Sequence, residues 1–131
     1  MKLSEAIRLG SMATVQGFGG ASILSNDAPC ALGAARLAIG GRAWCQLEAY
    51  DIIYRSFPIS EREMPMPSEL QEKYGKVSRI SRTIWLLNDI CKWSREAIAD
   101  WVETIEAEAC AEELQAVPIS AKPSMVEPCS K

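Results

Sequence analysis

The sequence predicts an all-α domain of four to five short helices, formed by residues 1–112, followed by a disordered tail at 113–131. Helix start and stop signals divide the first half of the chain, and apolar residues recur at helical spacing in the second half. The last segment holds three prolines and small polar residues without an apolar period, which is typical of disorder. A chain of 131 residues can bury a small core without disulfides.

The first predicted helix lies in LSEAIRLGSM, residues 3–12. Ser4 is a suitable N-cap, and Gly10 would either end the helix or let another segment approach closely. The glycine run GFGGAS that follows at 17–22 lacks the spacing of a phosphate-binding loop, and no Gly-Lys-Ser/Thr comes after it. We therefore expect a plain loop after the first helix.

The second predicted helix lies in NDAPCALGAARLAIGG, residues 26–41. Asn26 or Asp27 can cap it, a proline suits its first turn, and the glycine pair at its end would stop it. Alanine and glycine dominate its body, and small residues let helix axes come close. The sequence therefore indicates a central helix packed on several sides, with Arg36 marking its solvent-exposed strip.

The helical signal is weaker in the next two segments. Residues 42–57 could form a helix, although DIIYRSF could also be extended, and after a proline-rich connector a short helix could start at Ser68 and end at Gly75. Residues 76–90 form the next, because apolar residues from Val77 to Cys91 follow a 3-4-3-4 spacing.

The last helix is predicted at 94–108, with Ser94 as its N-cap. The four tryptophans are interpreted as core anchors rather than as a platform for nucleic-acid bases. The expected core consists of Leu32, Leu37, Ile80, Ile84, Leu87, Ile98, Trp101 and Val102.

Charge is divided sharply between two neighbouring segments. Residues 73–95 hold six bases and one acid, whereas 96–113 hold seven acids and no base. The spacing of the last two helices resembles a helix-turn-helix, but phosphates would repel so acidic a second helix. The first interpretation is that the two segments are antiparallel helices that pair opposite charges.

Two alternatives remain for these charges. A basic patch could bind DNA or RNA through Lys76, Arg79, Arg82, Lys92 and Arg95. An acidic surface could dock a protein partner through Asp100, Glu103 and Glu106. The net charge of −3 argues against non-specific coating of nucleic acid.

Histidine is absent, which removes the commonest general base and the commonest metal ligand, so no catalytic residue and no cofactor is predicted. Charge appears before any apolar run at the N-terminus, which indicates no signal peptide. The five cysteines, none in a CxxC pair, are therefore expected as reduced thiols in a cytoplasm. No apolar stretch approaches the ~20 residues of a membrane span.

Four stretches in this order, LSEAIRLG, CALGAA, LND and WSREAIADWVE, resemble a set of small uncharacterised proteins encoded in phages, prophages and bacterial genomes. The resemblance covers Leu3–Gly10, Cys30–Ala35 and Leu87–Glu103, about a quarter of the chain. Those relatives have LND-x-H-x-W where this chain has Cys91, and some carry a CxxC pair, which together would imply a small zinc site. Here such a site would need the scattered thiols Cys30, Cys45 and Cys91.

The sequence thus favours a non-enzymatic protein-binding module with an acidic helical surface. The resemblance implies a phage accessory protein, which could modulate or inhibit a host system. The alternatives are a nucleic-acid-binding regulator that uses the basic 73–95 segment and a small thiol-ligated zinc domain. No membrane association is expected.

Overall fold

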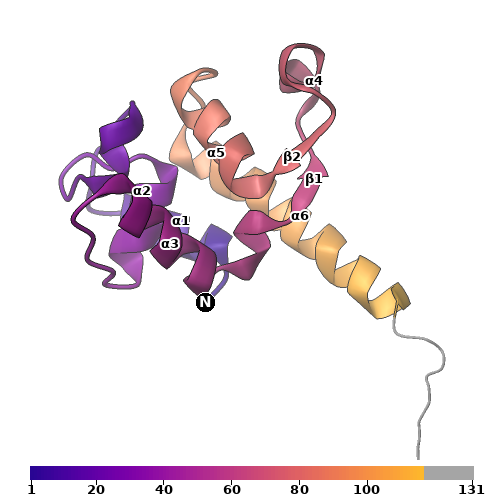
Figure 1. Ribbon diagram of the computed structural model, residues 1–131, viewed down its shortest axis with the longest axis horizontal. Helices are drawn as coiled ribbons and strands as arrows, with labels where there is room; N and C mark the ends of the chain where they lie inside the picture. The colour runs from indigo at the N-terminus through magenta and orange to yellow at the C-terminus, as the bar shows by residue number, and fades with distance from the viewer. Residues whose placement is uncertain (117–131) are drawn as a thin grey trace, which may run out of the picture.

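The computed structural model describes residues 1–116 and confirms the predicted all-α class, with helices throughout and one small hairpin (Figure 1). The α-helices are α1 (Leu3–Ser11), α2 (Ala31–Ala38), α3 (Gln46–Ser56), α4 (Ser68–Tyr74), α5 (Ile80–Asp89) and α6 (Arg95–Ala116). The other elements are two 3-10 turns, η1 (Gly20–Leu24) and η2 (Pro58–Glu61), and two strands, β1 (Glu63–Pro65) and β2 (Val77–Arg79).

The described part therefore has six α-helices instead of four to five, and the last one is not short. Helix α6 has 22 residues and continues to Ala116, so residues 113–116 are helical and do not belong to the predicted tail. The rest of that predicted tail, 117–131, lies outside the described residues.

Helices α1 and α2 pack against each other at backbone distance. A Cβ atom built on Gly10 would lie 1.8 Å from the carbonyl oxygen of Ala34 in α2, so only glycine fits at this crossing. Gly10 therefore admits a neighbouring helix and does not end its own, which is the second of the two expectations for this residue. Ser4 is not the N-cap of α1 but a buried residue inside its first turn.

Two predictions about α2 are wrong. The N-cap is Cys30, whose Sγ atom accepts a hydrogen bond from the Gly33 N–H at 3.5 Å, and not Asn26 or Asp27. Arg36 does not face solvent but is buried. Its guanidinium donates to the carbonyl oxygens of Ile23 and Gly41 at 2.8 and 2.7 Å, because the chain on both sides of α2 folds back over it. These acceptors replace the water that the buried charge loses.

The helix predicted at 76–90 begins only at Ile80, because the residues before it pair with β1 in an antiparallel hairpin. The backbone bonds that flank the hairpin run from the Met66 N–H to the Lys76 oxygen (2.9 Å) and from the Ile80 N–H to the Arg62 oxygen (3.0 Å). Val77 is consequently 51% exposed and is not part of the buried stripe. The apolar period is helical only from Ile80 onward.

The expected core is largely confirmed. Leu32, Ile80, Ile84, Leu87, Ile98 and Val102 are buried. Leu37 and Trp101 are half-buried at its margin. Helix α1, helix α3, strand β1 and helix α4 add Leu3, Ile7, Ile53, Met64 and Leu70.

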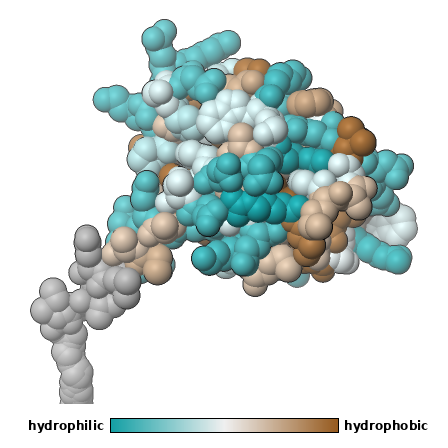
Figure 2. All heavy atoms as spheres, turned by 180° about the vertical axis from the view of Figure 1, so that it is seen from behind, coloured by the Kyte–Doolittle hydropathy of each residue, from teal (hydrophilic) through white to brown (hydrophobic). Residues whose placement is uncertain are grey.

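The interpretation of all four tryptophans as core anchors is wrong for two of them: Trp44 is 89% exposed just before α3, and Trp85 is 39% exposed in α5. Leu47, one turn after Trp44, is 80% exposed. In the view from behind, hydrophilic side chains cover most of the surface, and hydrophobic ones gather mainly on the side away from the C-terminal trace (Figure 2). No helix within residues 1–116 is both long enough and apolar enough to cross a membrane.

Replacement of Gly10 by alanine should destabilise the fold by roughly 1–3 kcal/mol, because the added methyl group meets helix backbone that must move. The free energy of unfolding from urea titrations measures this loss. Gly20→Ala is the matched control, since a Cβ there meets only the flexible end of Gln46. A Gly10→Ala protein as stable as the wild type would contradict the close packing of α1 on α2.

Candidate functional site: a groove of arginine and aromatic side chains

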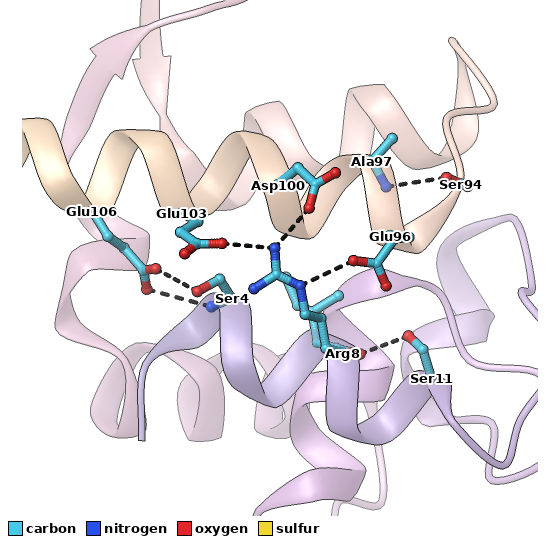
Figure 3. A network of polar contacts seen from close by, with 10 residues as sticks. Ser4, Arg8, Ser11, Ser94, Glu96, Ala97, Asp100, Glu103 and Glu106 are labelled. Atoms are coloured by element: carbon cyan, nitrogen blue, oxygen red, sulfur yellow. Dashed lines mark hydrogen bonds and ion pairs between the residues drawn. The ribbon is translucent and has the colours of Figure 1, made fainter.

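The acidic face of α6 is turned toward α1. The guanidinium of Arg8 lies between three carboxylates, at 3.0 Å from Glu96, 2.7 Å from Asp100 and 2.8 Å from Glu103 (Figure 3). The hydrogen bonds to Asp100, Glu103 and Glu96 raise the pKa of Arg8 above its ordinary value. One cation from the N-terminal helix therefore holds three acids of the last helix.

Other acids of α6 also contact the body of the protein. Glu106 accepts hydrogen bonds from the hydroxyl (2.6 Å) and the N–H (3.3 Å) of Ser4, the residue that was expected to be an N-cap (Figure 3). Glu112 pairs with Arg62 next to β1. All three residues of the predicted acidic docking surface, Asp100, Glu103 and Glu106, thus already have partners within the chain.

The predicted pairing between the basic and the acidic segment is wrong. Within residues 1–116, every ion pair of α6 goes to Arg8 or Arg62, and none goes to a base of 73–95. The 73–95 segment is also not one helix, since it contains the end of α4, the strand β2 and the helix α5. Its bases are therefore spread over several surfaces.

Arg95 was predicted to contact nucleic acid, but it is only 7% exposed. Its guanidinium donates to the carbonyl oxygens of Thr14 (2.6 Å) and Pro29 (3.2 Å) and to the Thr14 hydroxyl (2.9 Å). Burial lowers its pKa. These acceptors come from the loops that flank α1 and α2, so Arg95 joins α6 to both and is not available to a ligand.

A second buried group, Asn88, supports the same junction. Its side-chain oxygen accepts from the Ala31 N–H (3.2 Å) and from Gln16 (2.9 Å), and its amide donates to the Gly17 oxygen (3.0 Å). Gln16 in turn accepts from the Arg95 N–H at 3.2 Å. The end of α5 is therefore fixed to the same loop as the start of α6.

The other predicted nucleic-acid-binding residues lie in three places. Lys92 has a positive φ of 57° in the turn before α6, with its ammonium 4.4 Å from the centre of the Phe18 ring. Lys76 is exposed just before β2. Arg79 and Arg82 both line one groove, which we call the arginine groove.

The arginine groove has a volume of about 480 Å³ and lies where α3, α5 and the hairpin meet. Tyr50 and Tyr54 contribute from α3, with ring centroids 6.0 Å apart, and Trp85 contributes from α5 and is 39% exposed. Burial raises the pKa of Tyr50 to about 12. Its hydroxyl is protonated at neutral pH, as that of an ordinary tyrosine is, and can donate a hydrogen bond. The remaining lining comes from Glu63, Val77, Ser78, Arg79, Ser81 and Arg82.

The two arginines of the groove carry charge that no carboxylate pairs. Among the described residues no acid lies within ion-pair distance of Arg79 or Arg82. Arg82 donates to the Ser78 hydroxyl at 3.3 Å and lies over the Tyr74 ring at 5.7 Å. The groove therefore combines unpaired positive charge with aromatic walls, which suits a ligand with acidic groups beside apolar ones.

The sequence identified Arg79 and Arg82 as candidate binding residues but missed the three aromatic residues beside them. Trp85 was assigned to the core, and Tyr50 and Tyr54 belong to a helix some thirty positions earlier in the chain. No local pattern connects these positions, because the packing of α3 against α5 and the hairpin brings them together.

The scattered thiols do not form the alternative zinc site. In the part of the chain that the structure describes, no three cysteine or acidic side chains are grouped so that they could hold a metal ion. Cys30 caps α2, Cys45 is exposed before α3, and Cys91 is half-buried after α5. Burial and the nearby carboxylate of Glu69 raise the pKa of the Cys91 thiol.

Comparison of this chain with protein family models, with curated proteins and with solved structures finds no match. The groove and its surroundings are therefore interpreted from their own chemistry.

Truncation of Arg95 to alanine should lower the free energy of unfolding by roughly 3 kcal/mol, because several buried carbonyl groups lose their donor. Arg42→Ala removes an exposed arginine with the same change of net charge and should cost less than about 0.5 kcal/mol. Chemical denaturation of both variants measures the difference. Equal stability of the two would show that Arg95 does not hold the junction.

Cys91 should be alkylated by iodoacetamide more slowly than Cys45 at pH 8. Its raised pKa leaves less thiolate at a given pH, and thiolate is the reacting species. Raising the pH should narrow the difference. Mass spectrometry of peptides after a short reaction measures both sites, with denatured protein as the control in which they react alike. Faster labelling of Cys91 in the folded protein would contradict its described environment.

Proposed function

We propose that this protein is a non-enzymatic protein-binding module and that the arginine groove docks an acidic segment of its partner. The observation that carries the proposal is the pair Arg79 and Arg82, which line one groove of about 480 Å³ and have no carboxylate partner among residues 1–116. Carboxylates of a partner can form bidentate hydrogen bonds with such guanidinium groups.

The groove is favoured over the acidic face of α6 as the docking surface. A basic partner at Asp100 and Glu103 would compete with Arg8, and one at Glu106 would compete with Ser4. No such competition exists at Arg79 or Arg82 within the described residues. Docking through the acidic face stays a prediction, to be tested beside the groove.

The groove chemistry supports binding more than catalysis. Its lining offers guanidinium and hydroxyl donors, ring faces and one carboxylate, Glu63. The exposed Trp44 and Leu47 add apolar contact area outside the groove, and exposed tryptophan is a frequent centre of protein–protein interfaces. A phage-borne modulator of a host system, which the sequence resemblance implied, is one setting for such a module and stays a prediction.

Binding of single-stranded nucleic acid is the second candidate. Arginine and aromatic side chains in one groove also suit phosphates and stacked bases. Glu63 in the groove wall would repel a phosphate as it would a partner's carboxylate, so it does not separate the two candidates. The predicted nucleic-acid-binding set is smaller than expected, because Arg95 is buried. The surface for this candidate is therefore reduced to Lys76, Arg79 and Arg82, with Lys92 in a separate turn.

Affinity capture with the full chain from host lysate tests the proposal, with and without nuclease treatment. The wild type should capture a protein partner from both lysates. The Arg79→Glu and Arg82→Glu variants should each capture at least tenfold less of it, because each replaces an ion pair with a repulsion. Arg42→Glu makes the same charge change at an exposed site outside the groove and should capture normally.

Three results would contradict this proposal. Undiminished capture by both groove variants would remove the groove as the docking surface. Loss of the partner in Glu103→Gln and Glu106→Gln alone would transfer the role to the acidic face. Recovery that disappears with nuclease would establish the nucleic-acid candidate instead.

A further inference from the structure

Strand β2 has one edge that β1 does not use. The pairing register places Met64 opposite Ser78, between the flanking bonds Met66 N–H to Lys76 O and Ile80 N–H to Arg62 O. In an antiparallel ladder, hydrogen-bonded pairs alternate with pairs whose backbone groups point outward. The N–H and C=O of Val77 and the N–H of Arg79 therefore point away from β1.

These outward groups are open. Among residues 1–116, no hydrogen bond from a side chain or from another element reaches the N–H or C=O of Val77 or the N–H of Arg79. Val77 is 51% exposed, so solvent reaches this part of the strand. An uncovered strand edge is a template for a further strand.

The open edge and the arginine groove lie on the same strand. Val77 and Arg79 line the groove, and Arg82 follows them in the first turn of α5. Arg79 is both the last residue of β2 and the N-cap of α5, so the backbone edge and the backbone positions of the two arginines are held in one arrangement. A single extended ligand can use both.

We infer that the groove binds its partner by β-strand addition: an extended, acidic segment of another protein pairs with the open edge of β2 and directs its carboxylates to Arg79 and Arg82. This inference rests on the proposed function and specifies how the same site is used. Main-chain bonds would supply affinity, and the alternate side chains that face the arginines would supply selectivity.

The charge of the edge indicates whether the added strand comes from another protein or from a second copy of this chain. Two copies joined through β2 would bring together Lys76, Arg79 and Arg82 of both, and opposed like charges destabilise strand pairing. Basic residues at an edge are a common protection against self-association. An acidic segment meets a single like charge there, Glu63 opposite Arg79, and neutralises the basic side chains.

Selection of binders from a random 12-residue peptide library on the immobilised full chain provides the probe. Selected peptides should be enriched in acidic and β-branched residues. Fluorescence anisotropy should then show roughly three- to tenfold weaker binding of the selected peptide when the one backbone amide that donates to the Val77 carbonyl is methylated, and unchanged binding when a neighbouring amide is methylated. One sensitive amide between insensitive neighbours is the result expected for pairing with this short edge.

Two variants of the protein test the edge itself. Val77→Pro removes the outward N–H and spares the bonds to β1, whereas Val77→Thr keeps both the N–H and the branched side chain. Val77→Pro should weaken the binding of the selected peptide by a similar factor, and Val77→Thr should leave the affinity unchanged. Circular dichroism checks the fold, and peptide methylation remains decisive where Val77→Pro does not fold.

The outcomes separate this inference from the function on which it rests. Peptides that lose affinity with Arg82→Glu, but not with Val77→Pro or with methylation of any single amide, would bind the groove without adding a strand and would overturn the inference alone. Peptides insensitive to Arg82→Glu, or a library without any enriched sequence, would contradict both. Dimerisation of the wild type that Val77→Pro abolishes would assign the edge to a second copy.

Discussion

The buried guanidinium of Arg95 is the interaction on which the rest of this fold depends. It donates to carbonyl oxygens of the loop after α1 and of the residue before Cys30, and it belongs to the first residue of α6. A buried charge is tolerated only where such acceptors replace water. Because the donor belongs to the start of α6 and the acceptors to the loop after α1 and to the segment before α2, these three segments take up their positions together.

The position of α6 then decides how the charges of the molecule are distributed. Its acids meet Arg8 in α1 and Arg62 beside the hairpin, and these two bases are sufficient to engage five of its carboxylates. The bases Arg79 and Arg82 are left without acids of their own chain. A protein of net charge −3 thereby acquires a positively charged groove.

The groove depends on the unusual continuity of β2 and α5. One residue, Arg79, ends the strand and caps the helix, so an open backbone edge and the backbone positions of the two arginines share one frame. The aromatic side chains Tyr50 and Tyr54 from α3 and Trp85 from α5 line the groove beside these arginines. Recognition of an extended acidic segment follows from this combination, since neither a strand edge nor two arginines alone would select one ligand class.

The sequence by itself determined the helical class and most of the core, and it identified the two groove arginines as candidate binding residues. Apolar periodicity and side-chain chemistry are local properties, so they can be read without the tertiary structure. The tertiary structure alone decided that Arg36 and Arg95 are buried, that Trp44 is exposed, that α6 pairs with α1, and that Tyr50 and Tyr54 join Arg79. Each of these depends on acceptors or neighbours supplied by distant segments. An arginine looks the same in the sequence whether water or backbone carbonyl groups surround its guanidinium. Only the packing of the segments that carry those carbonyl groups decides between the two.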